Sequence, residues 1–150
     1  MMKTNMGRAA AAGIAGTLVM TAVGLWVAPL MAIPAMNPAQ MLAGAMGGST
    51  LLGWMAHLMI GVVLAIGYAV VAPWLPGASA LRGAIYALAP FLAAQTMVMP
   101  MMGMPLFSGS AALAAGSLIG HLVYGMVVGA VYGPVPDRAE AAVARTAPAR

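Results

Sequence analysis

The sequence predicts an all-α membrane protein, a four-transmembrane-helix bundle built from a duplicated two-helix hairpin. Composition is the first observation behind this prediction: apolar types make up 63% of the 150 residues and charged types only 5%. Soluble domains carry about 25% charged residues, because their surface must face water. The other two observations are four long apolar segments and a histidine pattern that occurs twice. Together they indicate that lipid surrounds the chain.

Four segments are long enough to cross a bilayer, which takes about 20 mostly apolar residues in a helix. They cover residues 9–31, 51–72, 79–99 and 111–133. Prolines and glycines lie in the connections between them and mark turns. Pro90 falls inside the third segment, where neighbouring helices can satisfy the carbonyl that it frees. We therefore expect one transmembrane domain over residues 1–133, and a disordered tail rich in Ala, Arg and Pro over residues 134–150.

The first segment follows Lys3 and Arg8, as the core of a signal peptide would. Its apolar stretch has the length of a membrane span, whereas a signal core has about 7–15 residues. It also has a counterpart later in the chain. We therefore expect this segment to be retained as a span.

A short extra helix is expected between the first two segments. Asn37 suits an N-cap, Pro38 the first turn and Gln40 the third position, while Gly47 and Gly48 stop the helix. This helix is too short to span a bilayer. We expect it to lie at the outer interface as a lid on the bundle.

Charged residues fall on one side of the four predicted spans. Lys3 and Arg8 precede the first span, and Arg82 begins the third. The others follow the fourth span: Asp137, Arg138, Glu140, Arg145 and Arg150. Positive charge is enriched on the cytoplasmic side of membrane proteins, so both termini are expected in the cytoplasm.

The strongest signal is an internal repeat. The pattern His57-Leu58-x-x-Gly61-x-Val63-x-Ala65-x-x-Tyr68 is followed 64 positions later by His121-Leu122-x-x-Gly125-x-Val127-x-Gly129-x-x-Tyr132. The box from Pro29 to Pro34 recurs 71 positions later, from Pro100 to Pro105. Two hairpins with the same orientation would be related by a pseudo-twofold axis along the membrane normal.

Helical periodicity puts the repeated polar and small residues on one face. At about 100° per residue, the histidine and the positions four, eight and eleven residues later lie close together. A stripe of polar and small residues on a membrane helix belongs inside the bundle. The candidate site residues are therefore His57 and His121 in the outer half of the bilayer, lined by Gly61, Ala65, Tyr68, Gly125, Gly129 and Tyr132.

At these residues the chain resembles a family of small, uncharacterised bacterial inner-membrane proteins of about the same length with four predicted spans. The likeness covers nearly the whole chain, through Gly53-Trp54-x-x-His57, Leu81-Arg82-Gly83 and Gly120-His121-Leu-x-Tyr124-Gly125. The resemblance implies a multi-pass protein of the bacterial inner membrane. It implies no activity.

The two histidines predict a shared ligand. Imidazoles from diagonal helices can bind one metal at about 2.0–2.1 Å each, or a haem between them. Haem b is the candidate cofactor, with Gly61 and Gly125 leaving room for a porphyrin face. No propionate partner is found, because Arg8 and Arg82 lie toward the opposite membrane face. The alternative is a structural role, in which each buried neutral histidine bonds a carbonyl.

Methionine is abundant, with 16 residues, many of them near the uncharged outer connections. A candidate soft-metal cluster comprises Met97, Met99, Met101, Met102 and Met104. Thioethers prefer Cu(I), and imidazole also binds copper. The alternative is that methionine fills gaps between apolar surfaces.

The composition also excludes classes of function. The chain has no cysteine, and both of its acidic residues lie near its end, so thiolate metal sites and carboxylate catalysis inside the membrane are excluded. No nucleophile–base pair can be assembled, so we expect no enzyme. Six dispersed cations make no basic patch for nucleic acid.

Three functional hypotheses remain. We expect an accessory or scaffold subunit of a larger membrane complex or homo-oligomer. The alternative is a haem- or copper-binding protein that uses His57 and His121. The third is a small-solute transporter, which lacks an intramembrane acid or lysine to couple transport.

Overall fold

The structure is a computed structural model, and it describes residues 4–136 of the chain. This part of the chain is helical and contains no strand. The elements are α1 (Met6–Ala22), η1 (Val23–Val27), η2 (Ala28–Met31), α2 (Pro38–Ala45), α3 (Thr50–Val71), η3 (Ala72–Trp74), α4 (Ser79–Ala93), η4 (Ala94–Val98), α5 (Met99–Met101), η5 (Leu106–Gly109) and α6 (Ala111–Tyr132).

Several of these elements join into four continuous helical stretches that are long and apolar enough to cross a membrane. They are Met6–Met31, Thr50–Trp74, Ser79–Met101 and Ala111–Tyr132. The four predicted segments are therefore confirmed as helices. The ends differ by up to three residues: the first stretch begins at Met6, three residues earlier than predicted, and the third ends at Met101, two residues later.

Side-chain caps fix where the helices begin. The Asn5 side chain accepts a hydrogen bond from the Arg8 N–H at 2.9 Å before α1. Ser49 and Ser110 cap α3 and α6 in the same way. The predicted short helix is confirmed as α2, where the Asn37 side chain accepts from the Gln40 N–H at 3.2 Å. Each cap satisfies a backbone donor that the first turn leaves free.

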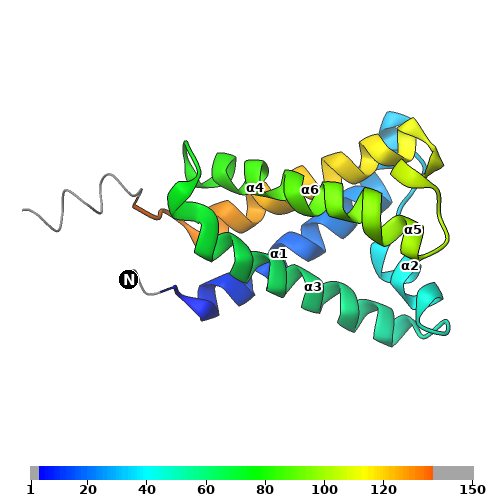
Figure 1. Cartoon of the computed structure of the whole chain (residues 1–150), viewed down its shortest axis with the longest axis horizontal. Helices are drawn as coiled ribbons and strands as arrows, with labels where there is room; N and C mark the ends of the chain where they lie inside the picture. The colour runs from blue at the N-terminus through cyan, green and yellow to red at the C-terminus, as the bar shows by residue number, and fades with distance from the viewer. Residues whose placement is uncertain (1–3, 137–150) are drawn as a thin grey trace, which may run out of the picture.

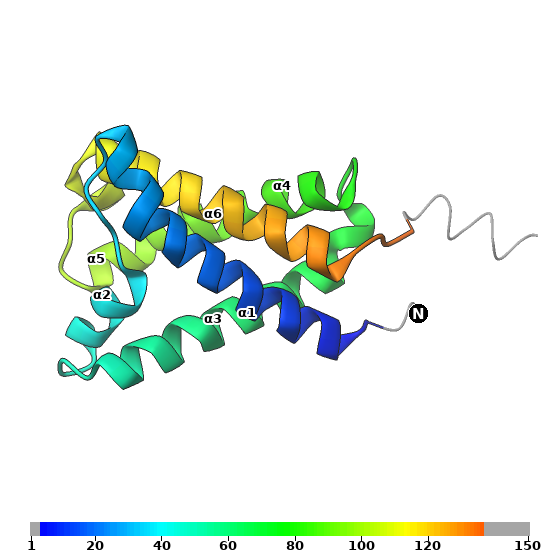
Figure 2. The same cartoon turned by 180° about the vertical axis from the view of Figure 1, so that it is seen from behind.

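Helices α1 and α6 cross at the centre of the bundle, with α3 packed against α1 and α4 packed along α6 (Figures 1 and 2). The described chain ends lie together at one end, here called the terminal end, and α2 and α5 lie at the other, the loop end (Figure 1). Helices α3 and α4 are joined at the terminal end and diverge toward the loop end. The bundle is therefore closed at one end and splayed at the other.

Glycines allow close approach within each pair of packed helices. A Cβ on Gly83 of α4 would overlap the Gly125 carbonyl oxygen of α6, and a Cβ on Gly125 would overlap the Gly83 carbonyl oxygen. On α1, a Cβ on Gly13 would lie 2.7 Å from the Gly61 carbonyl oxygen of α3. Small residues at these crossings let the backbones of the two helices meet.

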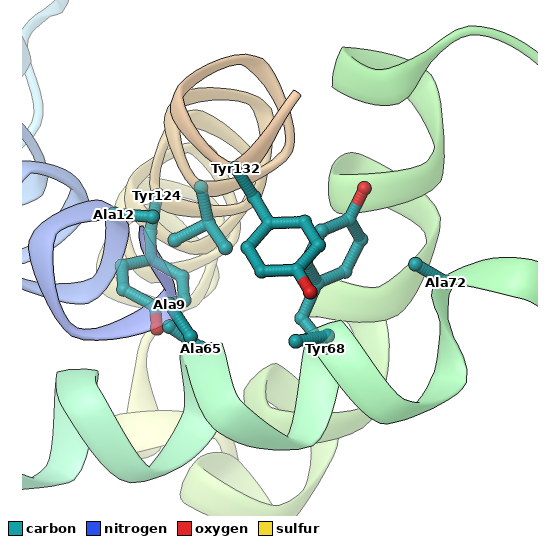
Figure 3. Packing of buried hydrophobic residues seen from close by; sticks show 9 residues of the cluster. Ala9, Ala12, Ala65, Tyr68, Ala72, Tyr124 and Tyr132 are labelled. Carbon is teal, nitrogen blue, oxygen red and sulfur yellow. The ribbon is translucent and has the colours of Figure 1, made fainter. Parts of the chain in front are cut away.

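Tyrosines fill the terminal half (Figure 3). The Tyr68 ring lies edge-on to Tyr132 at 6.0 Å and to Tyr86 at 5.7 Å between centroids. The Tyr68 hydroxyl donates to the Ser79 carbonyl oxygen at 3.1 Å. We call the buried cluster around these rings the tyrosine core; its members are Ala9, Ala12, Ala65, Tyr68, Ala69, Ala72, Tyr124, Val128 and Tyr132.

Two π-helical segments, η1 and η4, were not predicted from the sequence. In η1 the Ala28 N–H donates to the Val23 carbonyl, and after η4 the Met99 N–H donates to the Ala94 carbonyl, five residues back in each case. Each segment ends two residues before a proline, Pro29 or Pro100. A proline has no N–H and interrupts the regular hydrogen-bond pattern, and a π turn is one way of rearranging it.

Residues 134–136 have no regular secondary structure. Arg82 Nη1 donates to the Val135 carbonyl oxygen at 2.6 Å, which holds this segment against α4. Most of the predicted disordered tail, residues 137–150, lies outside the described residues.

Candidate functional site

The loop half of the bundle encloses a cavity of about 290 Å³. Its walls come from α1, α3, α4 with η4, and α6, and parts of the α2 and α5 regions close it at the loop end. Most lining side chains are apolar. The polar ones are Thr17, His57, Gln95, Ser108, Ser117, His121 and Tyr124. Both histidines thus line one cavity.

His57 lies on α3 and is 7% exposed. Its Nε2 lies 3.0 Å from the Thr21 hydroxyl oxygen of α1. That hydroxyl already donates its single hydrogen to the Thr17 carbonyl oxygen at 2.8 Å. Thr21 therefore accepts from His57, and the proton of the neutral ring is on Nε2.

His121 lies on α6, and its ring is edge-on to Phe91 at 5.7 Å between centroids. Its Nδ1 lies 2.8 Å from the Ser117 carbonyl oxygen. A carbonyl can only accept, so Nδ1 carries the proton and Nε2 carries a lone pair. A backbone carbonyl fixes histidine metal ligands in the same tautomer.

Both rings are expected to be neutral. No charged side chain lines the cavity, and an unpaired imidazolium in apolar surroundings is costly. The neutral tautomers leave lone pairs on His57 Nδ1 and His121 Nε2. Within residues 4–136, neither atom has a hydrogen-bond partner. We call this pair the free ring nitrogens.

Gln95 is a site residue that the sequence analysis missed. It is 1% exposed, its Nε2 donates to the Ser117 hydroxyl at 2.9 Å, and its Oε1 accepts from the Ser108 hydroxyl at 3.0 Å. Ser108 has φ 60°, an uncommon left-handed conformation that this bond helps to hold. A glutamine in an apolar span was the available signal, since such amides bond between membrane helices.

Tyr124 separates the cavity from the tyrosine core. Its buried hydroxyl donates to the Gly61 carbonyl oxygen at 2.6 Å and joins α6 to α3. Both residues line the cavity, and the Tyr124 ring also belongs to the tyrosine core (Figure 3). The cavity therefore ends where the tyrosine core begins.

The structure brings only part of the predicted site together. Of the six lining residues predicted beside the histidines, Gly61 lines the cavity. Ala65, Tyr68 and Tyr132 lie in the tyrosine core instead. The other two, Gly125 and Gly129, face the α4 backbone: a Cβ on either would overlap a carbonyl oxygen there. The expectation that Gly61 and Gly125 leave room for a porphyrin face is therefore wrong, because the Thr17 side chain fills the space at Gly61 and the α4 backbone fills it at Gly125.

The predicted methionine cluster is also divided. Met99 and Met102 line the cavity, whereas Met97 and Met101 are 62% and 84% exposed. Met104 lines a second hollow of about 240 Å³ beyond η2. Three methionines from other segments complete the set that lines the main cavity: Met20, Met36 and Met41. Residues 4–136 contain no group of three or more His, Cys, Asp or Glu side chains that could hold a metal ion.

Comparison with known proteins places the chain in a family. No curated protein and no solved structure matches it. A family model described as a family of unknown function, DUF6789, matches residues 3–143, which is most of the chain. The protein therefore belongs to the DUF6789 family of unknown function.

Proposed function

We propose that this protein is a non-enzymatic, multi-pass membrane protein that binds a small ligand between His57 and His121. The observation that carries the proposal is that both histidines line one largely apolar cavity and that each has a free ring nitrogen. Apolar pockets with a few convergent polar groups are the usual form of ligand sites. An unpaired polar atom beside an internal space can be satisfied by a bound molecule or by ordered water.

The size of the cavity limits the ligand. An engineered protein cavity of about 150 Å³ binds benzene. The present cavity, about 290 Å³, has room for roughly two such rings. It is small for haem b, whose macrocycle joins four pyrrole rings. The haem propionates would need cationic partners. Arg8 and Arg82, the two cations among residues 4–136, lie at the terminal end beside Tyr132 and Val135, away from the cavity.

Cu(I) is a second candidate ligand, favoured by the composition of the lining. Five methionine thioethers line the cavity with the two histidines: Met20, Met36, Met41, Met99 and Met102. Thioethers and neutral imidazoles are soft or borderline ligands that suit Cu(I). Neither ligand type adds charge, which fits a site without acidic residues.

We also propose that the bundle arose from a duplicated hairpin. Three sets of matching features support this. The π segments η1 and η4 begin 71 positions apart, as do Pro29 and Pro100. Thr21 and Phe91, 70 positions apart, each lie beside the histidine of their own hairpin. Gly61 and Gly125, 64 positions apart, are both contact points between helices.

In a bacterial inner membrane we propose that the terminal end faces the cytoplasm. Arg8 and Arg82 both lie at that end, which agrees with the positive-inside bias. A reporter inserted after Gly47 should then be active outside the cytoplasm, and one fused after Arg150 inside it. Cytoplasmic activity of the Gly47 fusion would contradict this orientation.

Ligand content tests the proposed function. Protein purified in nanodiscs from copper-replete cells should retain a small molecule by native mass spectrometry, or bind Cu(I) in competition with a chelator. Gly120→Leu should lower this occupancy at least tenfold, because Gly120 lines the cavity and has only ordinary contacts at its Cβ position. Gly44→Leu is the matched control, since open space surrounds Gly44.

Two results would overturn the ligand-binding proposal. One is wild-type protein that carries no small molecule and does not compete for Cu(I). The other is equal loss of occupancy in the Gly120→Leu and Gly44→Leu variants. An empty cavity would leave the accessory or scaffold role as the remaining hypothesis, within a larger membrane complex or a homo-oligomer.

A further inference from the structure

The cavity opens sideways, between α3 and α4. Ile60 on α3 and Val98 on η4 both line it, yet these side chains are 42% and 40% exposed. Ala93 of α4 also lines the cavity and is exposed. Ile60 belongs to α3, and Ala93 belongs to α4 directly before η4. Helices α3 and α4 diverge toward the loop end (Figures 1 and 2). In a membrane such an opening meets lipid chains, so it admits lipid-soluble molecules.

The free ring nitrogens give the cavity two hydrogen-bond acceptors. His57 Nδ1 and His121 Nε2 carry lone pairs because their partner nitrogens donate to Thr21 and Ser117. Two nearby hydroxyl hydrogens are already used, because Thr17 donates to Gly13 and Tyr124 donates to Gly61. The Ser117 hydroxyl accepts from Gln95 and keeps its own hydrogen, so it adds one donor beside the two nitrogen acceptors. A ligand that complements these groups must itself supply O–H or N–H donors.

We infer that the ligand is a lipid-soluble molecule with a single-ring head that bears hydroxyl donors, a phenol or quinol. Its head lies between His57 and His121 and donates to the free ring nitrogens. Its apolar tail leaves the bundle between α3 and α4, past Ile60, Ala93 and Val98. This inference rests on the proposed function and names the chemical class of its ligand.

The cavity volume fits a ligand whose ring lies inside the cavity and whose tail leaves it. One aromatic ring occupies about half of the space, given that about 150 Å³ holds benzene. The remainder accepts the first part of a tail beside the cavity methionines, which adapt to irregular shapes. The oxidised form of the same head, a quinone, presents carbonyl acceptors to nitrogen acceptors and forms no such bonds.

A pair of probes tests the inference. The first is a benzoquinol with a ten-carbon tail, kept reduced under argon, and the second is its dimethyl ether, which has no O–H donor. Binding to the full chain in nanodiscs is measured against protein-free nanodiscs. We expect the ether to bind at least tenfold more weakly, since each lost hydrogen bond costs about that factor. The double variant His57→Leu/His121→Leu should bind both probes alike.

The route between α3 and α4 has its own variant. Ala93→Phe narrows the opening and should weaken binding of the tailed quinol at least tenfold. Leu92→Phe is the matched control, because Leu92 is exposed on the same helix but does not line the cavity. Equal effects of the two substitutions would overturn the sideways route.

The outcomes distinguish failure of the proposed ligand class from failure of ligand binding itself. Equal binding of quinol and ether to the wild type overturns the hydroxyl-donor class but leaves ligand binding in place. Failure of both probes, in a protein that does compete for Cu(I), also overturns the class and favours the metal. Failure of both probes and of Cu(I) overturns the proposed function itself. Folding of each variant is checked by its retained helical circular dichroism and monodispersity.

Discussion

The two halves of this bundle use the same four helices in opposite ways. In the terminal half, aromatic side chains fill the interior, and the Tyr68 and Tyr124 hydroxyls donate to backbone carbonyls. In the loop half, α3 and α4 diverge around a cavity, and two histidine nitrogens have no partner among residues 4–136. A satisfied, filled interior stabilises a fold, whereas a hollow one with free acceptors has the properties of a binding site.

The largest expected effect lies at the close helix contact on which both halves depend. Gly83→Val puts a side chain against the Gly125 carbonyl, where a backbone must move. We expect a loss of about 3 kcal/mol in unfolding free energy, the upper range for overpacking. Gly120→Ala, whose Cβ meets Met20 at 3.4 Å, should stay within about 1 kcal/mol of wild type. Equal stability of the two variants in detergent unfolding would show that this contact does not hold the bundle.

The second-largest loss of stability is expected at Gln95, the buried amide side chain of the loop half. Gln95→Leu leaves the Ser117 and Ser108 hydroxyls without their partner. We expect a loss of about 2 kcal/mol, because buried polar groups then go unpaired. The strained turn at Ser108 should also become protease-sensitive, which limited proteolysis can measure. Wild-type stability together with an uncut turn would mean that this bond does not order the loop end.

A smaller effect is expected at the boundary between the halves. Tyr124→Phe removes the hydrogen bond to the Gly61 carbonyl but keeps the ring in the tyrosine core. Bonds of this kind between membrane helices contribute about 0.6–2 kcal/mol, and we expect about 1 kcal/mol. Thermal unfolding in detergent measures it. A loss above about 3 kcal/mol would mean that the ring, too, has been displaced.

The smallest effect on stability is expected at the histidines, where we expect the largest effect on binding. His121→Leu removes a donor from a helix carbonyl and a free acceptor from the cavity, and it leaves no new buried polar atom. We expect the unfolding free energy to change by less than about 0.5 kcal/mol, while ligand or Cu(I) binding is lost. If stability falls instead and binding persists, His121 has a structural role.

The four long apolar helices and their caps could be predicted because they depend on local properties of the chain. Four apolar stretches set the helices, and Asn37 with Pro38 set the start of α2. The repeated stripe also placed His57 and His121 on inward faces, and both line the cavity. Periodicity could not show which neighbour each face meets. Gly61 packs against Thr17 of α1 and also lines the cavity, whereas Gly125 packs against the α4 backbone and does not line it.

Gln95 shows a different limit of the sequence analysis. A helical wheel assumes about 3.6 residues per turn from end to end. The π segment η4 contains Gln95 and changes that spacing, so the side chains after it point elsewhere than a wheel predicts. Met99 and Met102 reach the cavity beyond this point, whereas Met97 and Met101 do not. Met99 and Met102 are three residues apart, and Met97 and Met101 are four apart, so each pair shares one helix face. The π turn changes the direction in which these faces point.

The π turn of η4 also separates the glycine contacts of α4 from the cavity-lining residues that follow it, Met99 and Met102. Deleting one residue from η4 would restore ordinary α-helical bonding and rotate the chain beyond it by about 100° relative to α4. Met99 and Met102, which follow η4 and line the cavity, would be reoriented in a single step. If the loop before α6 took up the rotation, the glycine contacts and the tyrosine core would keep their partners. Under the proposed function, a one-residue length change in this segment would alter ligand preference without rebuilding the scaffold.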